Sequence, residues 1–236
     1  MKYTKIFYRN VIDLVNSIEE FEDEKIRLAA FKVADTTENN GIIHSFGSGH
    51  SVLASLETFI RAGSFSNTKP INKELEIDRF ERLSGIGKAL MKKFSGLPGE
   101  VMFIFSNSGR NPLPIEIAEE ARKKGLFTIA ITSFRSAEID NSDSTNLINV
   151  VDLPIDSHVP YGDASVQLDD TNIKMAPLSS IANAILLHAI YCKAAEILIS
   201  RGITPPIRIS RNTPTGDAYN KKFIEMYASR IPELRY

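Results

Sequence analysis

Two short turns in the sequence carry residues that could bind a phosphate group. Each follows an apolar run of strand type and leads into a helical pattern. Small residues let an anion approach the unpaired N–H groups at the start of a helix, and serine hydroxyls donate hydrogen bonds without bulk. The pattern therefore predicts an anion site built by both turns, which read Phe46-Gly47-Ser48-Gly49-His50-Ser51 and Phe105-Ser106-Asn107-Ser108-Gly109-Arg110-Asn111-Pro112.

Either turn taken alone could be no more than a capped helix start, because Ser and Asn are preferred N-cap residues. Other phosphate motifs fit less well. The sequence has no G-x-x-x-x-G-K-[ST] loop, and Gly47-Ser48-Gly49 lacks the third glycine of a dinucleotide fingerprint. The hydrolase elbow G-x-S-x-G is absent as well. A serine-rich turn after two separate strands favours an anion site over two unrelated caps.

An ionisable side chain near such a site could move protons on a bound sugar. Glu57 follows Ser51 by six residues, which is roughly 9 Å along a helix axis. Its carboxylate could act as the base, and the alternative is a solvated or interfacial glutamate that pairs with Arg61 at i+4. His50 either touches the ligand or caps the helix. His188 lies on an apolar helical face, which favours a hydrogen-bonded core histidine, with catalysis as the alternative.

The strands that would position these turns appear as four apolar runs, at 42–46, 101–105, 127–131 and 147–151. The second run, Val-Met-Phe-Ile-Phe, has no polar alternation, which suits a parallel strand covered by helices on both faces. Strand–helix–strand alternation predicts a parallel sheet with right-handed crossovers. In such sheets ligands bind at the carboxyl ends of the strands, near the reversal of strand order. The two turns would then form one pocket.

Helical stripes account for much of the remaining chain. Residues 1–40 predict two helices, ended by Asn39-Asn40-Gly41. A further helix begins near Pro112 and ends at Gly125. Residues 178–199 predict a long helix buried against the sheet or a partner subunit. The less regular segments predict a long loop with a short helix at 63–99 and a polar surface loop at 133–146.

Bulk composition narrows the functional classes. The chain has 236 residues, 43% hydrophobic and 24% charged, and its net charge of −1 gives no electrostatic case for nucleic-acid binding. One cysteine excludes an internal disulfide and a cysteine-built zinc site, and the four histidines lack metal-ligand spacing, so neither metal nor cofactor is expected. No apolar run reaches the roughly 20 residues of a membrane span. The first residues lack a secretion signal. We expect a cytoplasmic protein of small-molecule metabolism without a membrane partner.

Five sequence pieces, in their order along the chain, resemble the sugar isomerase (SIS) domain family. Within it the chain is most similar to a bacterial subfamily of stand-alone SIS proteins that are labelled phosphoheptose isomerases. The resemblance extends over nearly the whole chain. The pieces are Phe59-Ile60-Arg61-Ala62-Gly63, Glu81-Arg82-Leu83-Ser84-Gly85, Ser106-Asn107-Ser108-Gly109-Arg110-Asn111-Pro112, Tyr161-Gly162-Asp163-Ala164 and Pro205-Pro206-Ile207.

The resemblance implies the α/β fold class, as a three-layer α/β/α sandwich around a five-stranded parallel sheet with flavodoxin-like topology. It divides the chain into a helical segment at 1–40, a phosphosugar-binding SIS domain at 41–204 and a tail at 205–236, all in one globular unit. It further implies a phosphorylated sugar as ligand, without metal in most members. A homodimer or dimer of dimers is expected, because family sites usually lie at a dimer interface.

Site residues follow from the same resemblance. By position, Ser51 matches the phosphate-binding serine of the first turn, and Ser106, Asn107 and Ser108 match the second turn. Asn111 stands where many members have threonine, and its amide can still donate. With the turn glycines and two later candidates, the predicted phosphate- and sugar-binding set is Gly49, Ser51, Ser106, Asn107, Ser108, Gly109, Asn111, Asp163 and Ser179.

The two later candidates have structural alternatives. Asp163 could be an Asx-turn residue, and Ser179 either caps the long helix or donates to the sugar. The predicted catalytic residues are Glu57, His50 and His188, because related enzymes carry a glutamate on the first-turn helix, some of them a turn later, and some phosphoheptose isomerases use a histidine on the long helix. The leading function is aldose–ketose isomerisation of a sugar phosphate. The alternatives are a non-catalytic phosphosugar sensor and a lyase or etherase.

Overall fold

A five-stranded parallel sheet forms the middle layer of the computed structural model, which describes residues 1–72, 80–139 and 145–235. The strand order is β2-β1-β3-β4-β5, and every neighbouring pair is parallel. This order is flavodoxin-like, so the predicted fold class is confirmed. The strands are β1 (Ile43–Gly47), β2 (Thr68–Pro70), β3 (Val101–Phe105), β4 (Phe127–Thr132) and β5 (Leu153–Asp156).

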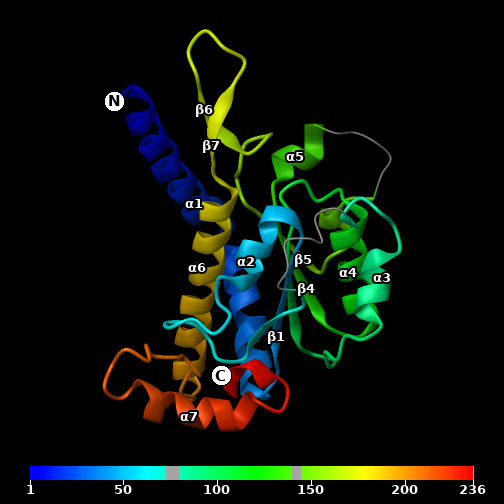
Figure 1. The fold of residues 1–236 in the computed structure, drawn as a ribbon, viewed down its shortest axis with the longest axis vertical. Coiled ribbons are helices and arrows are strands. Elements are labelled where there is room, and N and C mark those ends of the chain that lie inside the picture. The colour runs from blue at the N-terminus through cyan, green and yellow to red at the C-terminus, as the bar shows by residue number, and fades with distance from the viewer. Residues whose placement is uncertain (73–79, 140–144, 236) are drawn as a thin grey trace.

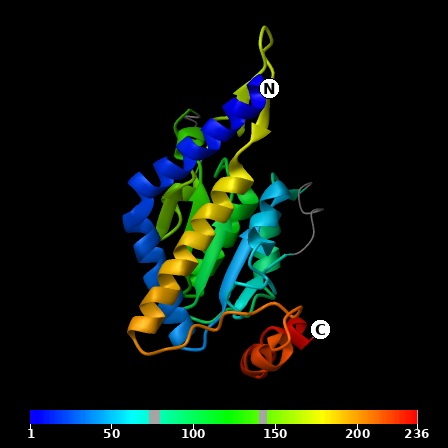
Figure 2. The same ribbon diagram turned by 90° about the vertical axis from the view of Figure 1, so that its left-hand side faces the viewer.

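Helices cover both faces of this sheet (Figures 1 and 2). The two long helices α1 and α6 lie side by side on one face, and α3 and α4 lie on the other. A hairpin of β6 and β7 projects beside the start of α1. The remaining elements are α1 (Lys2–Glu38), η1 (Gly49–Ser51), α2 (Val52–Leu56), α3 (Ile86–Met91), α4 (Pro112–Lys123), α5 (Phe134–Ile139), η3 (Leu147–Asn149), β6 (Ala164–Gln167), β7 (Lys174–Pro177), α6 (Ser179–Ser200), α7 (Gly216–Tyr227) and η4 (Pro232–Arg235), where η denotes a 3-10 helix.

Strand β3 shows how the sheet is buried on both faces. Phe103 and Phe105 pack into the core beneath α1 and α6, whereas Met102 and Ile104 pack beneath α3 and α4. All four side chains are at most 1% exposed. Burying each one contributes about 1.5–3 kcal/mol. The uninterrupted apolar run that predicted a parallel strand therefore reflects two cores rather than one.

The N-terminal residues form one continuous helix, so the prediction of two helices is wrong. The two predicted stripes lie on one face, joined by Glu22, which is four residues from both Ile18 and Ile26. Glu22 is buried, and its carboxylate accepts the N–H of Asp156 and contacts Nε2 of His158 at 3.1 Å. A buried carboxylate with such partners can occupy a core position. Hydrophobic periodicity alone has no signal for it.

One strand prediction and two loop predictions also need correction. Residues 147–151 contain η3, whose start is capped by Asn146 Oδ1 accepting the N–H of Ile148. The strand begins after them, at Leu153. The predicted long loop contains β2, a three-residue strand that ends at Pro70, and the predicted surface loop contains α5. Parts of both predicted loops, 73–79 and 140–144, lie outside the described residues.

Helix α6 meets the length and hydropathy criteria of a membrane span, with a mean hydropathy of 1.4 over its window, although no segment was expected to meet them. Core helices of soluble folds pass the same test. One face of α6, from Ala182 through Leu186 and Ile190 to Leu198, is buried in the core shared with α1 and the sheet. Its apolar character therefore has an explanation within the fold.

The C-terminal segment is attached to the sheet through the buried carboxylate of Glu100, just before β3. Arg230 donates to both Glu100 oxygens, and Nε2 of His44 lies 2.9 Å from one of them. Burial raises the pKa of Glu100, but the hydrogen bonds from His44, Arg230 and two backbone N–H groups outweigh it, so the pKa lies well below its usual range. Burial lowers the pKa of His44, outweighing its hydrogen bond to Glu100. His44 is therefore neutral and Glu100 is charged near neutral pH.

We expect the free energy of unfolding to fall as the pH drops from 7 towards 4. Both pKa values are lower in the fold than in the unfolded chain, where histidine titrates near about 6.5 and glutamate near about 4.3. The unfolded chain therefore takes up more protons as the pH falls through these values, and stability present above them is lost. Urea unfolding at pH 7, 5.5 and 4 measures this loss.

Glu100→Gln should lower the free energy of unfolding at pH 7 by about 1.5–3 kcal/mol, because it removes hydrogen bonds to a buried charge. Glu225→Gln, at an exposed position of α7, is the matched control and should change nothing measurable. Equal stability of the Glu100→Gln variant and the parent would contradict the role given to this carboxylate.

Candidate functional site

The two serine-rich turns lie side by side at the carboxyl end of the parallel strands. Strands β1 and β3 are parallel neighbours, with Gly47 opposite Phe105, so the segments that leave them start from adjacent positions. From β1 the chain goes to β2 on one side, and β3 leads to β4 on the other. Strand order therefore reverses between β1 and β3, where open α/β sheets bind their ligands.

The first turn is compressed around Gly47. A Cβ atom there would lie 2.2 Å from the carbonyl oxygen of Ser51, so only glycine fits. The first internal hydrogen bond of η1 runs from the N–H of Ser51 to Ser48 O. The N–H groups of Gly49 and His50 come before it, so they have no acceptor within this helix. Ser51 is half-buried, and its hydroxyl has no partner among the described residues. His50 is exposed.

The second turn is held by hydrogen bonds to its neighbours. Ser106 Oγ accepts the N–H of Gly109 at 3.3 Å. The carbonyl of Asn107 accepts the N–H of Ser133, and that of Gly109 accepts the N–H of Leu147. Gly109 has φ of 65°, a conformation that favours glycine. The backbone of this turn is therefore fixed before any ligand binds.

Several polar groups of the second turn remain available. Within the described part of the chain, the N–H groups of Asn107, Ser108 and Asn111 have no acceptor, and the side chains of Ser108 and Asn111 have no partner. Asn107 Oδ1 is buried without a hydrogen bond. Buried polar atoms in native proteins are nearly always paired. The turn therefore offers both donors for an anion and an acceptor for a hydroxyl.

Helix α4 contributes its dipole to this turn but not its own N–H groups, contrary to the expectation from sequence. Pro112 begins the helix, as predicted, and Pro114 follows, so neither position has an N–H. The N–H of Leu113 donates to the carbonyl of Glu81 at 3.1 Å. The Glu81 carboxylate also accepts the hydroxyl of Ser48 at 3.2 Å. Glu81 thus connects the first turn to the start of α4, a role that the sequence analysis did not assign to it.

Glu57 and His188, singled out separately in the sequence, lie in contact. Glu57 follows α2, and its Oε1 is 3.2 Å from Nε2 of His188 on α6. The same Oε1 accepts from Arg61 at 2.6 Å, the predicted i+4 pair. The His188 side chain is 41% exposed and that of Glu57 26%, so both can meet a ligand from solvent. His188 is therefore hydrogen-bonded, as expected, but it does not lie in the core as expected.

An open cleft of ≈ 670 Å³ adjoins this pair, between the segment that carries Glu57 and the first turns of α6. Ser180 and Ala184 line it on the α6 side, and Glu57 and Arg61 on the other. Its volume is in the range of small-molecule sites. Its lining includes Glu57 but none of the predicted phosphate-binding residues.

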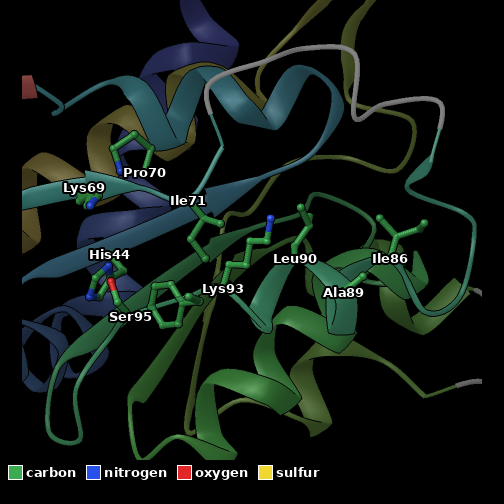
Figure 3. A pocket seen from close by; sticks show the side chains of 10 residues that line it. His44, Lys69, Pro70, Ile71, Ile86, Ala89, Leu90, Lys93 and Ser95 are labelled. Atoms are coloured by element: carbon green, nitrogen blue, oxygen red, sulfur yellow. The ribbon is translucent and has the colours of Figure 1, made fainter.

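Figure 3 shows a different cavity, of ≈ 470 Å³, on the face of the sheet that α3 covers. His44 and Lys69 reach it from β1 and β2, and Leu90 and Lys93 from the side of α3. It contains none of the residues that the sequence singled out for chemistry. Among residues 1–72, 80–139 and 145–235, no cluster of three or more histidine, cysteine, aspartate or glutamate side chains could hold a metal ion.

Asp163 and Ser179 contact each other at the start of α6. Asp163 Oδ1 accepts the N–H groups of Leu178 and Ser179, and its Oδ2 accepts the Ser179 hydroxyl at 2.6 Å. A carboxylate at a helix start satisfies unpaired N–H groups and interacts favourably with the dipole. This geometry shows helix capping by Asp163 from a distant turn. Sugar binding by either residue stays a prediction.

Comparison with known proteins identifies the family. A model of the SIS domain matches residues 6–133. A UPF0309 protein of Listeria monocytogenes serotype 4b (strain CLIP80459) is 36% identical over 234 residues, covering 94% of this chain and 95% of that relative. A UPF0309 protein of Geobacillus kaustophilus is 32% identical over 239 residues, covering 97% and 95%. The chain therefore belongs to the SIS domain family and, within it, to the UPF0309 proteins.

Solved structures share the fold at low sequence identity. A phosphoheptose isomerase from Francisella tularensis superposes with a TM-score of 0.59 at 15% identity, covering 83% of this chain and 99% of that one. The Vibrio vulnificus NanR protein, solved in complex with ManNAc-6P, gives a TM-score of 0.52 at 14% identity, covering 98% and 69%. The family resemblance read from the sequence is confirmed, as is the sheet architecture it implied.

Asp163→Asn should lower the free energy of unfolding by about 0.3–2 kcal/mol, because it removes a charge that interacts with the α6 dipole. Asparagine tolerates the positive φ of 69° at this position, so backbone strain does not enter. Asp170→Asn, at an exposed position that also has positive φ, is the control. Urea unfolding of both variants measures the difference, and equal effects would argue against capping.

Proposed function

We propose that the protein binds a phosphorylated sugar and interconverts its aldose and ketose forms. The observation that carries this proposal is the contact between Glu57 and His188, a carboxylate and an imidazole from distant parts of the chain. Aldose–ketose isomerisation needs a base that moves a proton between C1 and C2 and a group that moves protons on the two oxygens. A carboxylate beside an imidazole supplies one candidate for each role.

The phosphate is bound by the two turns in this proposal. The hydroxyls of Ser51 and Ser108 and the amide of Asn111 donate to its oxygens, together with the N–H groups of Asn107 and Ser108. Support comes from the absence of other partners for these groups within the described residues and from the fixed backbone of the second turn. Hydrogen bonds to a charged group are stronger than those between neutral groups. The Francisella protein is a phosphoheptose isomerase and the Vibrio protein was solved in complex with ManNAc-6P, which agrees with this ligand class.

In the proposed reaction, the Glu57 carboxylate takes the proton from C2 of the ring-opened aldose and returns it to C1 of the ketose. His188 gives a proton to the C1 oxygen as C2 is deprotonated, which forms the enediol. It then takes the hydroxyl proton from O2 as Glu57 protonates C1, so the ketose forms and both side chains regain their starting protonation. No redox step and no leaving group is involved. Glu57 must first release Arg61, which shares its Oε1. Ligand binding in the adjoining cleft would displace Arg61 from the Glu57 carboxylate.

The Arg61 contact also favours one second candidate, a phosphosugar sensor without turnover. A carboxylate that already accepts from a guanidinium is occupied, as expected for a structural ion pair. We also expect a homo-oligomer, as inferred from the family resemblance. Support for a partner surface comes from the exposed apolar side chains Tyr8, Ile12 and Phe21 on α1, which are 59–61% exposed.

Glu57→Gln should abolish exchange of the C2 hydrogen with solvent deuterium while ligand affinity changes little, because the amide keeps the shape but cannot accept the proton. Proton NMR of a panel of pentose, hexose, heptose and amino-sugar phosphates in D₂O measures this exchange. Glu196→Gln, at an exposed position of α6, is the matched control. Tight binding of a panel member with no exchange by the parent protein would instead establish the sensor.

Ser108→Ala should weaken binding of the same sugar phosphate by about 1.5–3 kcal/mol, roughly a 10- to 150-fold rise in Kd, because a hydrogen bond to a charged group is lost. Ser200→Ala removes a hydroxyl at the far end of α6, where it donates to a carbonyl of its own helix, and should leave Kd unchanged. Calorimetric titration measures both. An unchanged Kd for Ser108→Ala would show that this turn does not hold the phosphate.

A further inference from the structure

Arg208, in the segment before α7, is a buried arginine that has no counter-ion among the described residues. Its exposed fraction is 5%, and its Nη1 is buried with no hydrogen-bond partner. No carboxylate among residues 1–72, 80–139 and 145–235 forms an ion pair with it. A buried charge that lacks a partner is costly, and arginine cannot avoid the cost by losing its proton. This position therefore calls for an anion.

The backbone around Arg208 holds the side chain in place. Its N–H donates to Ser64 O at 2.9 Å, and its carbonyl accepts the N–H of Gly63 at 2.8 Å. The next residue, Ile209, is held by the side-chain amide of Asn220 on α7, which donates to its carbonyl and accepts its N–H. The guanidinium is thus presented by a fixed segment, as a preformed binding group requires.

Arg208 lines a cavity of ≈ 370 Å³ between this segment, α7 and η4. Besides Arg208, the lining contains the cations Arg211, Lys221 and Arg235, and one carboxylate, Asp217. Asp217 pairs with Arg211 at 2.8 Å, so it does not offset the other three charges. Burial lowers the pKa of Arg208 from its usual value, and the charge of Arg211 lowers it further. An anion would relieve both effects.

The cavity lies at the amino end of the parallel strands, whereas the two turns lie at their carboxyl end. Helix α7 packs on Ile42, immediately before β1, whereas the first turn follows the other end of that strand (Figure 1). The five residues of β1 separate the two ends of the strand by roughly 16 Å. One small ligand at the turns therefore cannot also neutralise Arg208.

We propose that this cavity is a second binding site, distinct from the turns, for a phosphate-bearing small molecule whose phosphate pairs with Arg208. The planar guanidinium matches phosphate oxygens two at a time. The surrounding cations Arg211, Lys221 and Arg235 supply the remaining positive field. The cavity volume is in the range of small-molecule sites, so the ligand extends beyond the phosphate itself.

Calorimetric titration of the full chain with inorganic phosphate tests this site in a Ser108→Ala background, where binding at the turns is weakened. Arg208→Met, added to that background, should weaken the remaining phosphate binding by about 10-fold or more, since it removes hydrogen bonds to a charged ligand. Lys222→Gln removes a positive charge from α7 outside the cavity and is the matched control, with no change expected. Crystals soaked in tungstate should show the anion beside Arg208.

Unfolding measurements provide a second readout. Phosphate should raise the unfolding temperature of the Ser108→Ala protein, because a ligand that binds only the folded state stabilises it. Arg208→Met should remove this rise without lowering the unfolding temperature in phosphate-free buffer, since the buried charge is gone. If Arg208→Met does not fold, Arg211→Gln, at an exposed position, should weaken binding by about 2- to 5-fold.

Unchanged phosphate binding in both arginine variants would overturn the proposal. So would a crystal in which another copy of the chain places a carboxylate against Arg208. Neither result bears on the sugar-phosphate site, whose own test is the effect of Ser108→Ala on sugar-phosphate binding in the parent. The two proposals can therefore fail independently.

Discussion

The parallel pairing of β1 with β3 is the constraint on which the candidate site depends. Because the two strands run side by side in register, the turns that follow Gly47 and Phe105 must start next to each other. Crossovers on opposite sides of the sheet then leave that position open to ligands. No single hydrogen bond in either turn could bring together segments about sixty residues apart in the chain. The sheet does so through its strand order.

Hydrogen bonds then fix the conformation of the two turns that the sheet brings together. Hydrogen bonds join the second turn to the residue after β4 and to the first residue of η3, and Glu81 connects α4 to the first turn. At the amino end of the strands, Glu100 attaches the C-terminal segment through Arg230. That attachment places α7 over the segment carrying Arg208. Glu100, whose buried charge is paired, and Arg208, whose charge has no partner in the described part of the chain, thus lie in the same region of the fold. Only Arg208 suggests a ligand.

Sequence reasoning worked where the signal was local and apolar. The run 101–105 coincides with β3, and Pro112 begins α4, since burial and proline geometry act on neighbouring residues. It failed where a distant partner decided the outcome. Glu22 continues the buried face of α1 only because His158 and Asp156 meet it. Three other features likewise depend on residues far away in the chain, so no spacing rule predicts them. They are the Glu57–His188 contact, the capping of α6 by Asp163 and the lack of a partner for Arg208 among the described residues.

In the proposed function, both turns hold one phosphate. Backbone amide NMR during titration with a sugar phosphate that binds the protein, and with the same sugar lacking phosphate, tests it directly. We expect the amides at 49–51 and 107–111 to shift together, with one shared Kd, only for the phosphorylated ligand. Shifts confined to one turn, or two turns that saturate at different concentrations, would contradict it.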